Sequence, residues 1–156
     1  MDIKELKPTS IWHYFDAITG VPRPSKKEER IREFLLNFAK EQNLEVKVDK
    51  TGNVVITKEA TPGCEGAPTV ILQAHMDMVC EKNGDVKHDF ERDPIETYID
   101  GEWVKARGTT LGADNGIGMA AAMAVPADKE LKHGRIQALF TVDEETGLTG
   151  AFGLES

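Results

Sequence analysis

Val70-Ile71-Leu72 is a continuous apolar run that leads directly into Gln73-Ala74-His75-Met76-Asp77. The run is short and is bounded by Pro68 on one side and by His75 on the other. Runs of this kind are typical of strands that are buried on both faces in a mostly parallel sheet. The segment therefore predicts a strand with His75 at its carboxyl end.

Helical and extended patterns alternate along the rest of the sequence. Helices are predicted at residues 10–18, from Ser25 onward and at 115–125. The second rests on a Ser25-to-Glu28 capping box, followed by apolar residues at helical spacing. Strands are predicted at 44–49, 54–57, 95–99, 103–106 and 136–142, and the first four of these form two β-hairpins. The pattern indicates an α/β fold with a mixed, largely parallel sheet flanked by helices.

Composition limits both the size of the fold and its partners. With 156 residues, 40% of them hydrophobic, the chain can form one domain or part of one. Its net charge of -8 argues against binding to nucleic acid or to an anionic membrane. The N-terminus has no signal pattern and no apolar run approaches the roughly 20 residues of a spanning helix, so we expect a cytoplasmic protein. Cys64 and Cys80 lack metal-site spacing and are expected to be free thiols.

Three clusters of acidic or imidazole side chains lie where predicted elements start or end. His75 and the pair Glu144-Glu145 follow strands, and Asp114 lies between a glycine-containing loop and a helix. In open α/β sheets, ligands bind beyond the carboxyl ends of the strands. We therefore expect the three clusters to meet in one site.

These residue types suit a two-metal hydrolase. Residues two apart on an extended segment point the same way, so Asp77 can accept a hydrogen bond from His75 and improve it as a metal ligand. If the backbone turns after the strand, one of Glu144 and Glu145 can bind metal while the other moves a proton. Two bridged ions would lower the pKa of a bound water from about 15.7 towards 7 and polarise a carbonyl group.

Each cluster also has a simpler interpretation. A lone histidine such as His75 is more often structural, and Asp114 is well placed to cap the helix that follows it. The acidic run 143–145 could be a solvated turn. Nucleotide binding is not favoured, because the glycines at 112, 116 and 118 match neither GxGxxG nor a following GK[ST].

Three runs resemble the aminoacyl-histidine dipeptidases, which are dinuclear zinc exopeptidases of the M20 family. They are LQAHMDMVC at 72–80, GTTLGADNGIG at 108–118 and EETGLTGAFGL at 144–154. The resemblance implies that His75 binds one zinc ion, that Glu145 binds the other and that Asp114 bridges the two. It assigns the general acid/base role to Glu144 and the orientation of His75 to Asp77. Zinc is the expected metal, although imidazole and carboxylates also accept cobalt or manganese.

The same resemblance implies hydrolysis of Xaa-His dipeptides such as carnosine, with a homodimeric parent enzyme. Members of that family are much longer and contain a lid domain and later metal ligands. Residues 1–156 are thus expected to form the N-terminal portion of a zinc-exopeptidase-like catalytic domain, without the lid and the C-terminal part, and to be inactive alone. The alternatives are another M20-type hydrolase, namely a tripeptidase or an N-acyl amino acid deacylase, and a non-enzymatic metal-binding module.

Overall fold

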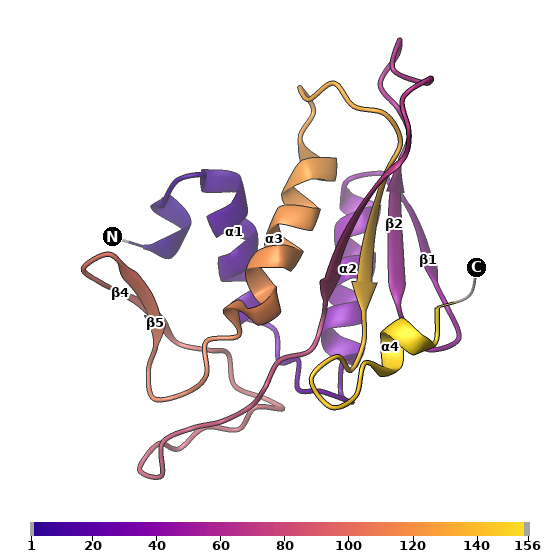
Figure 1. The fold of residues 1–156 in the computed structure, drawn as a ribbon. Helices are drawn as coiled ribbons and strands as arrows, with labels where there is room; N and C mark the ends of the chain where they lie inside the picture. Colours follow the sequence, from indigo (N-terminus) through magenta and orange to yellow (C-terminus); the bar gives the residue numbers. More distant parts are fainter. Residues whose placement is uncertain (1, 155–156) are drawn as a thin grey trace.

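A computed structural model describes residues 2–154 as a twisted sheet with helices packed on one face and a separate β-hairpin (Figure 1). The helices are the 3-10 helix η1 (Ile3–Glu5), α1 (Thr9–Thr19), α2 (Glu29–Glu41), α3 (Ala113–Ala127) and α4 (Thr149–Phe152). The strands of the main sheet are β1 (Glu45–Val48), β2 (Val54–Lys58), β3 (Val70–His75) and β6 (Ile136–Thr141). Strands β4 (Thr97–Asp100) and β5 (Trp103–Ala106) form the separate hairpin.

The strand order of the main sheet is β1-β2-β6-β3. The β1–β2 and β2–β6 pairs are antiparallel, whereas β3 and β6 are parallel, with His75 opposite Thr141. The mixed α/β class is confirmed, but parallel pairing is confined to one pair of the described strands, so the sheet is less parallel than expected. This one pair brings the ends of β3 and β6 to the same edge.

The core lies between the sheet and helices α2 and α3, and α1 packs against α3. Strand β6 alternates, with Ile136, Ala138 and Phe140 buried toward the helices. Full burial of a large apolar side chain such as Ile136 or Phe140 contributes about 1.5–3 kcal/mol relative to exposure. The buried residues of α2 are Ile31, Leu35, Phe38 and Ala39, which confirms the predicted apolar face of that helix.

Strand β3 is not buried on both faces, so that prediction was wrong. It lies at the edge of the described sheet, where Val70 and Ile71 remain 51% and 59% exposed. Only its carboxyl end, at Ala74 and His75, is buried. The strand thus begins on the surface and ends inside the molecule beside the predicted site.

The Ser25-to-Glu28 capping box is also wrong. Helix α2 begins at Glu29, and no side chain caps its amino end. The Ser25 hydroxyl instead donates to Asp77 Oδ2 at 2.7 Å, and Glu28 Oε1 accepts the backbone N–H of Asp143 at 2.8 Å. Ser25 and Glu28 thus bond to residues far away in the sequence and not to each other's backbone.

The remaining local predictions hold. Helix α1, helix α3 and both hairpins occupy the expected segments, and Gly101 has the positive φ (+61°) that its turn requires. Cys64 and Cys80 are free thiols, as expected. Among the described residues, no helix combines the length and the apolar character needed to cross a membrane.

Candidate metal centre

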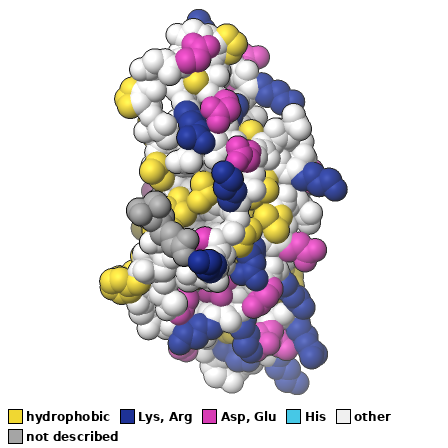
Figure 2. Space-filling model, turned by 90° about the vertical axis from the view of Figure 1, so that its right-hand side faces the viewer, with side chains coloured by type: hydrophobic (Ala, Val, Ile, Leu, Met, Phe, Trp, Pro, Cys, Tyr) yellow, Lys and Arg dark blue, Asp and Glu magenta, His cyan; other side chains and the backbone are white. Residues whose placement is uncertain are grey.

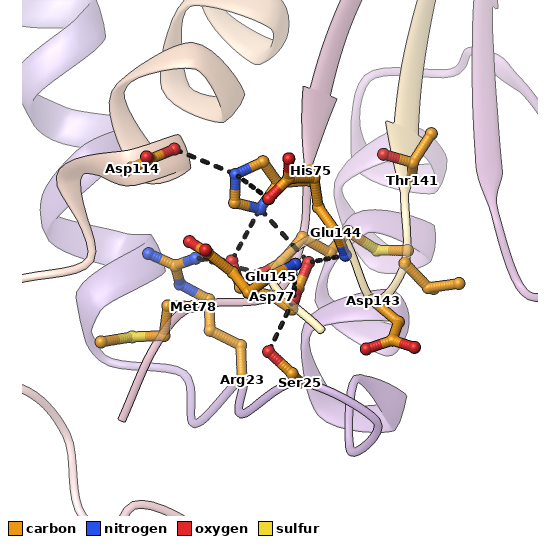
Figure 3. Close-up of polar contacts among 12 residues, drawn as sticks. Arg23, Ser25, His75, Asp77, Met78, Asp114, Thr141, Asp143, Glu144 and Glu145 are labelled. Atoms are coloured by element: carbon orange, nitrogen blue, oxygen red, sulfur yellow. Dashed lines mark hydrogen bonds and ion pairs between the residues drawn. The ribbon is translucent and has the colours of Figure 1, made fainter. Parts of the chain in front are cut away.

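The three predicted metal ligands meet at the edge where β3 and β6 end (Figure 3). His75 is the last residue of β3, Asp114 lies at the start of α3, and Glu145 lies in the turn after β6. One donor atom from each residue lies within 4.8 Å of the others. Since one imidazole and two carboxylates are ligands that zinc, cobalt and manganese all accept, the donor set fits a divalent metal.

Asp77 lies directly behind His75, as the sequence predicts. Its Oδ1 is 3.2 Å from Nδ1 of His75 and also accepts the backbone N–H of Glu144 at 3.0 Å. Its Oδ2 accepts the backbone N–H of Glu145 at 3.2 Å and the hydroxyl of Ser25. This fully buried carboxylate therefore orients both the imidazole ring and the turn that contains the two glutamates.

The other imidazole nitrogen faces the acidic side chains. His75 Nε2 lies 3.0 Å from Asp114 Oδ1 and 3.8 Å from Glu144 Oε2. Burial alone would lower the pKa of His75, but hydrogen bonds with Asp77 and Asp114 outweigh it and raise this pKa to about 9. Metal binding at Nε2 would require the neutral imidazole and would therefore release a proton.

The pKa values of two neighbouring carboxyl groups, Asp77 and Glu145, are shifted in opposite directions. Burial would raise the pKa of Asp77, but hydrogen bonds from His75, from Glu144 and Glu145 and from Ser25 hold that pKa far below its ordinary range. Burial raises the pKa of Glu145, and the nearby carboxylates add to this effect although His75 opposes it. Asp77 is therefore a permanent anion that supports the site.

The backbone after β6 turns, as required for the two glutamates to share one site. Asp143 has a φ of +48°, and the Glu144 carbonyl accepts the N–H groups of Gly147 and Leu148. Asp143 is only 5% exposed, so this run is not a solvated acidic turn. Glu144 and Glu145 both reach the space beside His75.

Asp114 does not cap helix α3. The cap position is Gly112, which makes no side-chain cap bond, and Asp114 itself has non-helical backbone angles. Its side chain is 84% exposed and contacts His75 instead. The capping alternative is therefore wrong, and the exposed carboxylate remains free to bind a ligand.

An open cleft of about 440 Å³ adjoins the cluster. Its polar lining includes His75, Asp114 and Glu144. Its apolar lining is Leu148, Ala151 and Leu154, from the segment that contains α4. A small molecule in this cleft would therefore meet both carboxylates and apolar side chains.

Arg23, Ser25 and Glu28 were not predicted to be site residues. All three belong to the segment before α2 and contact the segments that contain the predicted ligands. The one local signal was the position of Arg23 between Pro22 and Pro24, which restricts the backbone on both sides of a charged residue.

Comparison with known proteins identifies the family. Residues 71–155, more than half of the chain, match peptidase family M20/M25/M40. The chain belongs to this family. Over 154 residues the M20 chain is 53% identical to the cytosol non-specific dipeptidase of Escherichia coli (strain K12), a match that covers 99% of this chain and 32% of the relative.

Solved structures agree with this assignment. The aminoacylhistidine dipeptidase from Vibrio alginolyticus superimposes with a TM-score of 0.97 and 57% identity, over 100% of this M20 chain and 32% of that protein. A tripeptidase from Staphylococcus aureus gives a TM-score of 0.78 at 27% identity, over 94% and 39% respectively. The predicted resemblance to the aminoacyl-histidine dipeptidases is confirmed. The chain spans about a third of the length of the relatives it matches.

Proposed function

We propose that the full-length protein is a metal-dependent dipeptidase that hydrolyses Xaa-His and related dipeptides. The observation that supports this most is the convergence of His75, Asp114 and Glu145 within 4.8 Å, with Glu144 at the same cleft, in a chain of a peptidase family. The identity of 53% to a dipeptidase favours dipeptides over longer substrates.

In this proposal His75 and Glu145 would each hold one of two divalent ions, and Asp114 would be a ligand common to both. When bound, the ions would lower the pKa of a water molecule and polarise the substrate carbonyl. Zinc is the proposed metal, with cobalt or manganese as substitutes. Asp77 keeps the His75 ring oriented through its contact with Nδ1, which leaves Nε2 facing Asp114.

Glu144 is the proposed general base. Its Oε2 lies 3.8 Å from His75 Nε2, and its side chain lines the cleft with 38% exposure, so it can reach both water and substrate. Its carboxylate takes a proton from the attacking water and then delivers it to the leaving amine. The hydrogen bond from its backbone N–H to Asp77 holds the residue in place for both transfers.

The activity is proposed for the full-length protein and not for these 156 residues by themselves. At this cleft the described residues 2–154 bring together His75, Asp114 and Glu145 as ligands for two ions, whereas a catalytic zinc ion commonly has three protein ligands. We expect the isolated 156-residue polypeptide to bind zinc weakly and to be inactive. A homodimer is part of the same proposal, and a cytoplasmic location is supported by the cytosol designation of the Escherichia coli relative.

The test uses purified full-length protein loaded with zinc and a panel of β-alanyl-histidine, other dipeptides, tripeptides and N-acyl amino acids. Dipeptides should be cleaved fastest. Glu144→Gln should lower kcat by about 10²–10⁴-fold with unchanged zinc content, while the exposed control Glu130→Gln should match the unmodified protein. Preference for tripeptides or N-acyl amino acids would assign a different M20-type activity, and absence of any hydrolysis would favour a metal-binding module.

A further inference from the structure

The buried guanidinium of Arg23 joins two of the segments that contain predicted metal ligands. We infer that Arg23 is a positioning residue of the metal centre: its side chain holds the His75–Asp77 segment and the start of α3 at the separation that metal binding requires. The inference rests on the proposed function.

The contacts of Arg23 are with backbone carbonyl groups of both segments. Its Nη1 donates to the carbonyl oxygens of Met76 and Asp77, each at 3.1 Å. Its Nη2 donates to the carbonyl oxygen of Gly112 at 2.5 Å. One planar group thus bonds to Met76 and Asp77, just after His75, and to Gly112, two positions before Asp114.

Arginine is suited to this position by its geometry and not by its charge alone. The side chain is 2% exposed, and burial lowers its pKa to about 10 even though Asp77, Cys80 and Asp114 oppose that shift. Burying a charge is unfavourable unless strong hydrogen bonds offset the lost hydration. A guanidinium has donors fixed in a rigid fork that can serve acceptors on two segments at once, whereas a lysine ammonium is a single compact point.

The glycines on both sides of Asp114 lie against this guanidinium. A Cβ atom built on Gly112 would lie 2.6 Å from Arg23 Nη2, and one on Gly116 would lie 2.9 Å from it. Any larger residue would push the start of α3 away from the arginine. The backbone on both sides of Asp114 therefore approaches Nη2 of Arg23 closely.

The segment that contains Arg23, residues 23–28, also contacts the turn that contains Glu144 and Glu145. Ser25 donates to Asp77, and Glu28 accepts the backbone N–H of Asp143, next to the two glutamates. The backbone of Arg23 accepts the N–H of Met78 at 3.1 Å, which fixes the segment against the end of β3. Residues 23–28 thus contact the segments that contain His75, Asp114 and the two glutamates. Among residues 23–28, the hydrogen bond to the segment that contains Asp114 comes from the side chain of Arg23.

The sheet aligns some of the predicted metal ligands but not Asp114. His75 and the turn after β6 are already aligned by the parallel pairing of His75 with Thr141. Asp114 lies outside the sheet, so its distance from His75 depends on α3 packing and on the Arg23 contact with Gly112. Metal ligands must be held to about 0.5 Å for full affinity. Loss of Arg23 should therefore weaken metal binding beyond its effect on folding.

The experiment compares full-length protein with Arg23→Met, Arg23→Lys and the exposed control Arg30→Met. Zinc affinity is measured by chelator competition, the ligand field by the absorption spectrum of the cobalt-loaded protein, and folding by thermal unfolding without metal. We expect Arg23→Met to lose about 10–100-fold in zinc affinity and to show an altered cobalt spectrum. Arg23→Lys should fold well and recover only part of the affinity, and Arg30→Met should behave as the unmodified protein.

His75→Ala serves as the reference for the proposed function. If the unmodified protein does not bind zinc, or if His75→Ala binds it equally well, the proposed metal centre is wrong. If His75→Ala loses zinc while a folded Arg23→Met or Arg23→Lys retains the affinity and the spectrum of the unmodified protein, the positioning role of Arg23 alone is wrong. Arg23→Lys keeps the test decisive if Arg23→Met does not fold.

Discussion

At the scale of single residues, Asp77 is the point where most hydrogen bonds of the site converge. Both of its oxygens accept from donors: Oδ1 faces His75 and the N–H of Glu144, and Oδ2 faces Ser25 and the N–H of Glu145. In Asp77→Asn one carboxylate oxygen becomes an NH₂ group, which cannot accept a hydrogen bond. The two donors on that side would therefore lose their acceptor. We expect zinc affinity to fall about 10–100-fold, measured by chelator competition. The exposed control Asp85→Asn should have no effect, and a full-affinity Asp77→Asn would contradict the role of Asp77.

The protonation of His75 should make the zinc affinity of the site depend on pH. Without metal its pKa is raised to about 9, so at neutral pH the ring is protonated. A metal ligand must be the neutral imidazole, so binding expels this proton and becomes tighter as pH rises. Zinc affinity should increase by up to about tenfold per unit between about pH 6.5 and 8.5 and level off near the pKa.

Titration calorimetry in buffers of different ionisation enthalpy would measure the released proton directly. The exposed His13 provides the control, because His13→Ala should keep both the slope and the proton release. An affinity that does not change with pH would mean that His75 is already neutral or does not bind the metal.

At the scale of elements, Asn53 links the β1–β2 turn to the segment after β6. Its Nδ2 donates to Asp49 Oδ2 and to the carbonyl oxygen of Gly150, at 2.7 and 2.9 Å, and its Oδ1 accepts the N–H of Val142 at 3.0 Å. Asn53→Ala would leave several buried groups without partners. We expect the free energy of unfolding to fall by about 2–4 kcal/mol, measured by urea denaturation. Asn37→Ala, on the exposed face of α2, should change it by less than about 0.5 kcal/mol.

The elements that the sequence predicts correctly are those whose signal is local. The apolar periodicity of α2 and the Asp100-Gly101 turn depend on neighbouring residues, and both are confirmed. The capping prediction fails because Glu28 bonds to a residue 115 positions away. The burial of β3 depends on its neighbours in space, which its own sequence does not specify. Helix α4, with four residues, is too short to give a periodic signal.

The residues of the candidate site also fall into those with a local sequence signal and those whose contacts are distant in the sequence. Residue types and strand ends predicted that the clusters of His75, Asp114 and Glu144-Glu145 would meet, because each lies at the end or start of an element. They left open which glutamate binds metal, and the family resemblance supplied the choice of Glu145. Arg23 was not predicted, since its acceptors lie 53, 54 and 89 positions away and its position between Pro22 and Pro24 does not by itself indicate a functional site.

At the scale of the whole molecule, the longer helices α1, α2 and α3 all lie on one side of the described sheet. The opposite face, shown in Figure 2, has hydrophobic side chains gathered near its middle among charged residues. Since cross-strand partners point to the same side of a sheet, Ile71 and Gln137 lie together on this face, as do Val55 and Leu139. Ile71 is 59% exposed at the free edge of β3. An exposed apolar face beside an unpaired strand edge favours association with other chains.

We therefore expect the 156-residue polypeptide, produced by itself, to self-associate through this face. Light scattering, run with and without zinc because Ile71, Gln73 and His75 point to the same face of β3, should give a mass that rises with concentration. Ile71→Lys places a charge on the edge strand and should shift the mass toward the monomer. Leu131→Lys makes the same kind of change at a similarly exposed apolar residue outside the sheet, and should leave association unchanged. A single monomeric mass at every concentration would mean that the exposed sheet face does not drive association. Equal effects of the two substitutions would show that added charge, and not the position of Ile71, controls it.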